Sequence, residues 1–129
     1  MLDQNYGNFE HIIVDGASTD DTVQILKRYP HLNWISEPDN GEAEALNKGL
    51  RMASGDIIGW LNADDWYAAN VFQAIASTFN SAPDVHLVYG RSIYADENGS
   101  PNGWLTSRAP INLTTVSYTH LTLPTIVSV

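Results

Sequence analysis

The chain has no cysteine in its 129 residues, which excludes a disulfide framework and a metal site built from thiolates. Basic residues are also few, because 6 Lys and Arg stand against 15 Asp and Glu and give a formal net charge of −9. A surface this acidic argues against binding to nucleic acid or to an anionic membrane, since both require patches of positive charge. We therefore expect no nucleic-acid partner.

Long apolar runs are missing as well. No segment of the sequence is long and apolar enough to cross a bilayer, and the first residues lack the basic-then-apolar pattern of a secretory signal. We expect a cytoplasmic location, or one at the cytoplasmic face of a membrane if a longer parent protein carries a membrane segment. The glycine-rich fingerprints of P-loop and Rossmann nucleotide sites are absent too. Nothing in the sequence indicates an oligomeric state.

What the sequence does contain is an alternation of β-rich runs with apolar residues at helical spacing. The predicted strands are residues 9–14, 31–36, 57–61 and 85–89. One predicted helix ends at Pro30, a second spans 42–53 and a third begins near Val71. Three strand–helix alternations predict an α/β domain with a doubly wound, mostly parallel sheet. The helix residues expected in the core are Val23, Ile25, Leu26, Tyr29, Ala43, Leu46, Leu50, Ala53, Val71, Phe72, Ile75, Ala76 and Phe79.

Two segments near the C-terminal end differ from this pattern. Residues 92–95 are expected to continue or pair with the fourth predicted strand, and 96–99 (Asp-Glu-Asn-Gly) predict a tight turn. Residues 109–129 contain no charged residue and keep no regular period. Their last part resembles a translated sequencing adapter. We therefore expect 1–108 to form the domain and 109–129 to be a non-native or disordered tail.

The most informative feature is a predicted strand, Ile57–Leu61, that runs into Asp64 and Asp65. Open α/β sheets bind ligands at the carboxyl ends of their strands. Two carboxylates there suit Mg²⁺ or Mn²⁺, which take oxygen ligands and often bridge to substrate phosphates. The alternative is that Asp65 or a neighbour caps the following helix.

Three further residues lie where a ligand is expected. Asp15 ends the first predicted strand, where it either contacts a ligand or caps the next turn. Asn40 opens the second predicted helix with Gly41, so its free N–H groups either face a phosphate or belong to an ordinary Asn-Gly turn. Lys48, one helical turn from Glu44 on the expected surface of that helix, either meets a phosphate or pairs with this glutamate.

The segments VDGASTDDT, EPDNGEAEALNKGLRMASGD and IIGWLNADDW, in this order, resemble the nucleotide-binding half of a family 2 glycosyltransferase with the GT-A fold, over roughly Gln4–Gly90. The resemblance implies transfer of a sugar from a nucleotide donor, usually a uridine diphosphate sugar, to a hydroxyl of a sugar, lipid-linked sugar or polysaccharide. By position, it implies that Asp15 contacts the nucleoside, and that Asp64 and Asp65 contact the ribose and the metal-bound diphosphate.

The resemblance also has departures and gaps. Gly16 stands where many relatives have a second Asp that helps to recognise the base, and Asn62 replaces the first Asp of the usual acidic triplet. The family's first strand should precede Gln4, and its acceptor-binding half, with the catalytic base, should follow about Asn112. We therefore expect an interior fragment that is inactive alone. A sugar nucleotidyltransferase and a non-catalytic nucleotide-sugar-binding module are the alternatives.

Overall fold

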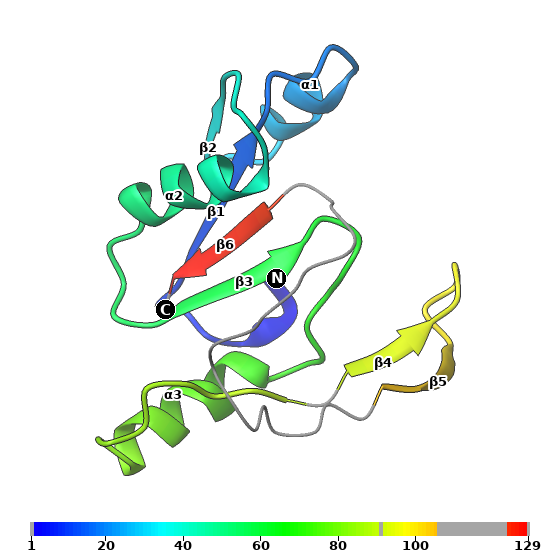
Figure 1. Cartoon of the computed structure of the whole chain (residues 1–129). Helices are drawn as coiled ribbons and strands as arrows, with labels where there is room; N and C mark the ends of the chain where they lie inside the picture. The colour runs from blue at the N-terminus through cyan, green and yellow to red at the C-terminus, as the bar shows by residue number, and fades with distance from the viewer. Residues whose placement is uncertain (1, 91, 106–123, 129) are drawn as a thin grey trace.

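The computed structural model describes residues 2–90, 92–105 and 124–128. Helices and strands alternate through the first part of the chain, and a hairpin and one further strand follow (Figure 1). The elements are η1 (Leu2–Gln4), β1 (Glu10–Asp15), α1 (Thr22–Leu26), β2 (Leu32–Ser36), α2 (Glu42–Met52), β3 (Ile58–Asn62), α3 (Val71–Ser81), β4 (Ser92–Ala95), β5 (Pro101–Leu105) and β6 (Pro124–Ser128). Among these described helices, none is long and apolar enough to span a bilayer.

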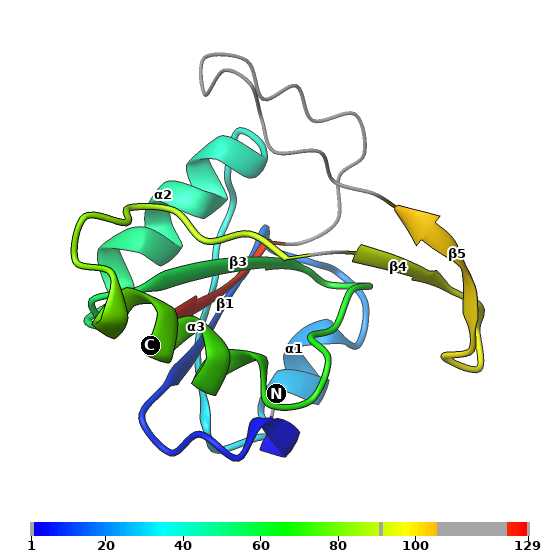
Figure 2. The same cartoon turned by 90° about the horizontal axis from the view of Figure 1, so that it is seen from below.

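The main sheet has four strands in the order β2-β1-β6-β3. β1 and β2 are parallel, with Asp15 opposite Ser36, whereas β6 runs antiparallel to both β1 and β3. β1, β2 and β3 therefore all point the same way and end at one edge of the sheet. Figure 2 shows α2 on one side of the sheet and α1 and α3 on the other. The α/β class is thus confirmed, while β6 makes the sheet mixed.

β6 is the largest difference from the sequence-based expectation. Residues 124–128, predicted to belong to a tail outside the domain, pair with β1 on one side and β3 on the other. We also expected an open edge beside β1, which is wrong because β6 occupies that position. The rest of the predicted tail, 109–123 and 129, lies outside the described residues.

The core lies between α2 and the sheet. Ile12 and Val14 of β1 are fully buried against Ala45 of α2, and the partly buried residues around them are Ile35, Leu46, Met52 and Ala53. The buried face of α2 carries Ala45, Lys48 and Gly49. Placing Ala43 and Leu50 in the core was therefore wrong, because both are exposed. Small residues on this face let the helix approach the sheet closely.

The first helix is shorter than predicted. α1 spans five residues and ends before Pro30, and only its Leu26 is buried. Ile25 and Tyr29, predicted to lie in the core, are exposed. A helix of little more than one turn covers one position on the sheet, so the longer apolar face has nothing to pack against.

α3 follows the prediction closely, with Phe72 and Ala76 buried. Its first N–H groups are satisfied by Gln4, which is 2% exposed and whose Oε1 accepts from the backbone N–H of Val71 at 2.9 Å and of Phe72 at 3.4 Å. A side chain distant in sequence therefore supplies the helix-capping interaction. The alternative that Asp65 or a neighbour caps α3 is wrong.

The predicted strand at 85–89 does not form, since residues 85–90 have no regular secondary structure. β4 instead pairs antiparallel with β5 in a separate two-stranded sheet. The tight turn between them is confirmed: Asp96 accepts from the backbone N–H of Gly99 at 2.9 Å, and Gly99 has a φ of 78°. Glycine adopts this left-handed conformation without strain.

Candidate functional site

Asp15 lies at the carboxyl end of β1 and is fully buried, at 0% exposure. Its carboxylate accepts hydrogen bonds from the Ser18 backbone N–H at 3.0 Å, from Ser18 Oγ at 2.5 Å and from Ser36 Oγ at 2.6 Å. Burial raises the pKa of Asp15, but the hydrogen bonds from Ser18 and Ser36 outweigh it, and the net pKa is lowered. Asp15 is therefore a buried anion that ties the loop after β1 to the end of β2.

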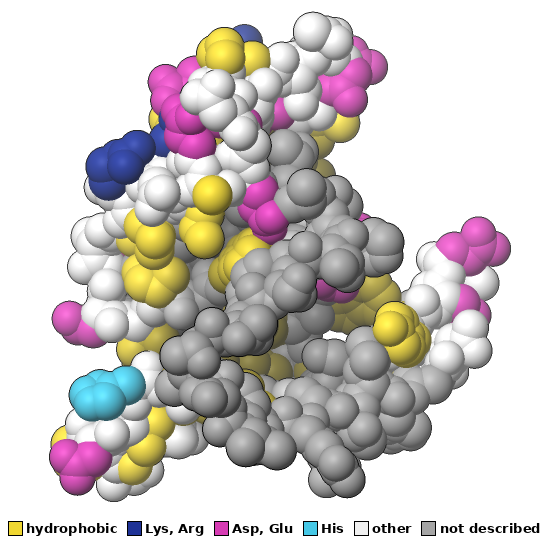
Figure 3. All heavy atoms as spheres, in the orientation of Figure 1, with side chains coloured by type: hydrophobic (Ala, Val, Ile, Leu, Met, Phe, Trp, Pro, Cys, Tyr) yellow, Lys and Arg dark blue, Asp and Glu magenta, His cyan; other side chains and the backbone are white. Residues whose placement is uncertain are grey.

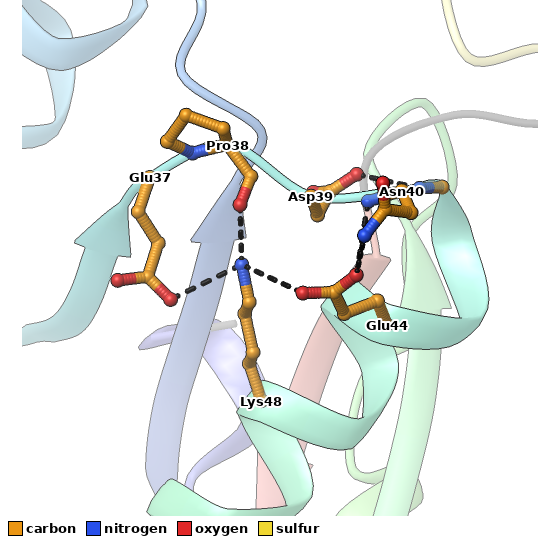
Figure 4. A network of polar contacts seen from close by, with 7 residues as sticks. Glu37, Pro38, Asp39, Asn40, Glu44 and Lys48 are labelled. Atoms are coloured by element: carbon orange, nitrogen blue, oxygen red, sulfur yellow. Dashed lines mark hydrogen bonds and ion pairs between the residues drawn. The ribbon is translucent and has the colours of Figure 1, made fainter.

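The loop from Glu37 to Gly41 joins β2 to α2 and is fastened to the helix by Lys48 (Figure 4). Lys48 is 8% exposed, so the prediction that it lies on the surface is wrong. Its Nζ donates to the Pro38 carbonyl at 2.7 Å and forms ion pairs with Glu37 at 3.1 Å and Glu44 at 3.7 Å. The pairing with Glu44 is the alternative weighed for this residue. An ammonium group with three partners of its own chain is not poised for a phosphate.

The N-terminus of α2 is likewise occupied by the chain itself (Figure 4). Glu44 Oε2 accepts from the backbone N–H of Asn40 at 3.1 Å and from its Nδ2 at 2.6 Å. Asp39 Oδ1 accepts from the Gly41 N–H at 2.9 Å. These N–H groups are engaged as in the alternative of an ordinary Asn-Gly turn, and this arrangement does not present Asn40 to a phosphate.

Asp64 and Asp65 follow β3 at the same edge of the sheet, and both are exposed. Asn62 Nδ2 donates to Asp65 Oδ2 at 3.1 Å, and the Asp65 N–H donates to the Asn62 carbonyl at 3.2 Å. A short turn therefore holds one carboxylate over the end of the strand. Trp66, next in the chain, is 62% exposed.

The acidic turn was tested as a cation site by its donor set. Within residues 2–90, 92–105 and 124–128, no three His, Asp or Glu side chains are arranged to hold a metal ion. Mg²⁺ keeps several waters and is often bound by only one or two carboxylates together with substrate phosphates. The carboxylates of Asp64 and Asp65 and the amide oxygen of Asn62 fit that kind of coordination.

The charge distribution points in the same direction. On the face in Figure 3, acidic side chains are spread over several places, while the visible basic ones lie together at the upper left. The chain has 6 Lys and Arg in all, and Lys48 is already paired. An anionic ligand at this sheet edge therefore needs charge compensation from a cation.

The structure brings together residues that sequence reasoning missed. Ser18 and Ser36 hold Asp15, Asp39 lies beside Gly16, and Gln4 caps α3. Serines after strands are common, so only the parallel register that sets Ser36 beside Asp15 reveals the link. The distance between Asp15 and the Asp64–Asp65 turn spans two strand positions of the sheet.

Comparison with protein families agrees with this geometry. A family model described as Glycosyl transferase family 2 matches residues 1–124. The chain belongs to glycosyltransferase family 2. The matched range includes β1, α2 and β3, which carry the acidic edge described above. The resemblance inferred from the three sequence motifs is thereby confirmed.

Individual family 2 relatives have the same assignment. An uncharacterized glycosyltransferase of Mycobacterium tuberculosis is 37% identical over 81 residues, 60% of this chain and 31% of the relative. A PGL/p-HBAD biosynthesis glycosyltransferase of Mycobacterium bovis is 34% identical over 101 residues, 74% of this chain and 40% of the relative. Chondroitin synthase of Escherichia coli is 30% identical over 109 residues, 80% of this chain and 16% of that enzyme.

The chain thus spans well under half the length of these relatives. No solved structure matches it.

Proposed function

We propose that this family 2 glycosyltransferase chain binds a nucleotide-diphosphate sugar, most simply a uridine diphosphate sugar, at the carboxyl edge of its sheet. The observation that carries the proposal is the pair Asp64–Asp65, exposed after β3 on the edge where Asp15 ends β1. Asp15 shapes the loop on the nucleoside side, and Asp64 and Asp65 lie on the diphosphate side.

The reaction we propose for the whole protein is glycosyl transfer to a hydroxyl acceptor. The acceptor oxygen bonds to the anomeric carbon of the sugar, and the bond from that carbon to the diphosphate oxygen breaks with its electron pair on the leaving group. The acceptor proton passes to a base, a role that we assign to none of the described residues. A sugar, lipid-linked sugar or polysaccharide supplies the acceptor hydroxyl.

A divalent cation, Mg²⁺ or Mn²⁺, bound by Asp64 and Asp65 would neutralise the charge that grows on the leaving diphosphate. Charge that increases in the transition state is stabilised selectively by such an ion. The chain's own part is to fix these two carboxylates on a turn held by Asn62.

Calorimetric titration of the chain with uridine diphosphate, with and without Mn²⁺, tests the proposal. We expect binding only with the metal, and we expect Asp65→Ala to weaken it by at least about tenfold, since a charged ligand contact is worth roughly 1.5–3 kcal/mol. Asp56→Ala is the matched control, because Asp56 is exposed and precedes β3 at the other edge of the sheet. Equal affinity of wild type and Asp65→Ala would count against the site.

A further inference from the structure

The carboxylate of Asp39 lies directly over Gly16. A Cβ atom added to Gly16 would lie 3.0 Å from Asp39 Oδ2 and 3.6 Å from its Cγ. Gly16 follows the last residue of β1, and Asp39 is the third residue after β2. The missing side chain at Gly16 therefore lets a carboxylate from one loop occupy the end of the neighbouring strand.

The two oxygens of this carboxylate have different surroundings. Oδ1 accepts the Gly41 N–H at 2.9 Å. Across the described parts of the chain, no hydrogen-bond donor reaches Oδ2. The loop that carries Asp39 is held on both sides by the contacts of Lys48 and Glu44 (Figure 4). Oδ2 is thus an acceptor whose position is fixed and whose lone pairs are available.

The local charge decides what such an acceptor binds. Glu37 and Glu44 lie beside the loop with Lys48 as their shared cation, so the loop with Asp39 keeps a net negative charge. A phosphate would be repelled here, whereas a neutral group with an N–H donor is attracted.

The spacing of the strands indicates which part of a nucleotide reaches the loop. β2 and β3 are three strand positions apart, which is about 14 Å at the usual strand spacing. This is comparable with the extended length of a nucleoside diphosphate. If the diphosphate lies at Asp64 and Asp65, the base lies near Asp39.

We infer that Asp39 accepts a hydrogen bond from the ring N3–H of uracil and thereby selects uridine over cytidine nucleotides. The inference rests on the proposed function. Cytosine has a lone pair instead of a hydrogen at N3, which would face the carboxylate oxygen without a hydrogen bond between them.

Asp39→Asn tests this because the chain itself orients the new amide. The Gly41 N–H requires an acceptor at Oδ1, so the amide NH₂ takes the place of Oδ2 and becomes a donor. Titration with uridine diphosphate and cytidine diphosphate in Mn²⁺ should show a preference for uridine of about tenfold or more in the wild type. In Asp39→Asn that preference should be lost or reversed, while Mn²⁺-dependent binding of inorganic pyrophosphate stays unchanged.

Two further variants complete the test. Gly16→Ala keeps every charge but forces the Asp39 carboxylate to move, so it should also reduce the preference for uridine. Asp56→Asn, the same chemical change at the opposite edge, should leave the preference unchanged. Circular dichroism would establish that each variant is folded, and Gly16→Ala serves if Asp39→Asn is not.

The outcomes separate the inference from the proposed function. A wild-type preference for uridine in both Asp39→Asn and Gly16→Ala would overturn the role of Asp39 while leaving metal-dependent donor binding intact. Failure of the wild type to bind either nucleotide or pyrophosphate with Mn²⁺ would overturn the proposed function and the inference with it.

Discussion

The sheet edge carries two acidic regions that the chain treats in opposite ways. After β1 and β2, Asp15 is buried with hydrogen bonds from two serines, and Lys48 fastens the next loop to α2. After β3, Asp64 and Asp65 are exposed on a short turn. The first region spends its charges on holding loops in place, which is what positioning of a rigid base requires. The second leaves carboxylates accessible, which is what a hydrated cation requires.

The sharpest way to break this comparison is to make the same substitution in both regions. Asp15→Ala should destabilise the chain by about 2–4 kcal/mol, because it leaves the Ser18 N–H and two buried hydroxyls without their acceptor. Asp65→Ala should stay within the roughly 0.5 kcal/mol typical of surface substitutions. Urea unfolding of both variants measures the difference. Similar losses would show that the two regions are not distinct.

Much of the scaffold of this comparison could be predicted from local patterns. Strands that end at Asp15 and near Asp64 follow from short apolar runs that stop at polar residues, and α3 follows from its apolar spacing. These signals lie within a few neighbouring residues.

What could not be predicted depends on contacts between distant segments. The burial of Lys48 follows from where Pro38 and Glu37 fall in space, and the position of Asp39 over Gly16 requires the register of β1 against β2. The predicted strand at 85–89 had the right composition but no neighbouring strand to pair with, and β6 pairs where a different strand was expected. Local composition does not specify partners of that kind.

Acidification separates the buried region from another titrating group on the same strand. Burial, reinforced by the nearby His31, lowers the pKa of His11 to about 4 from 6.5. Between these values the unfolded chain binds a proton that the folded chain does not, so stability falls as the pH drops from 6.5 to about 4. We expect a loss of about 1–2 kcal/mol, once solvent screening at a half-buried side chain is allowed for.

The pKa of Asp15 is lowered below 3.8, so its stabilising contribution is lost only at lower pH, when the unfolded carboxylate is protonated first. Urea unfolding across the pH range should therefore show two steps. His11→Leu should remove the upper step and keep the lower one. An upper step that persists in this variant would assign it to another group.

The smallest expected effect sharpens the exposed region. Asn62→Asp replaces the amide that donates to Asp65 Oδ2 with a third carboxylate beside Asp64 and Asp65. Two facing carboxylates repel without a cation and share one when it is present, so Mn²⁺ should bind several-fold more tightly, while urea stability without metal falls slightly. Calorimetric titration with Mn²⁺ alone measures the first effect, and Asp56→Asn, which also changes the charge by one, controls for the field of the whole chain. Unchanged Mn²⁺ affinity in Asn62→Asp would mean that the turn after β3 does not hold the ion, and the contrast between the two acidic regions would then concern stability alone.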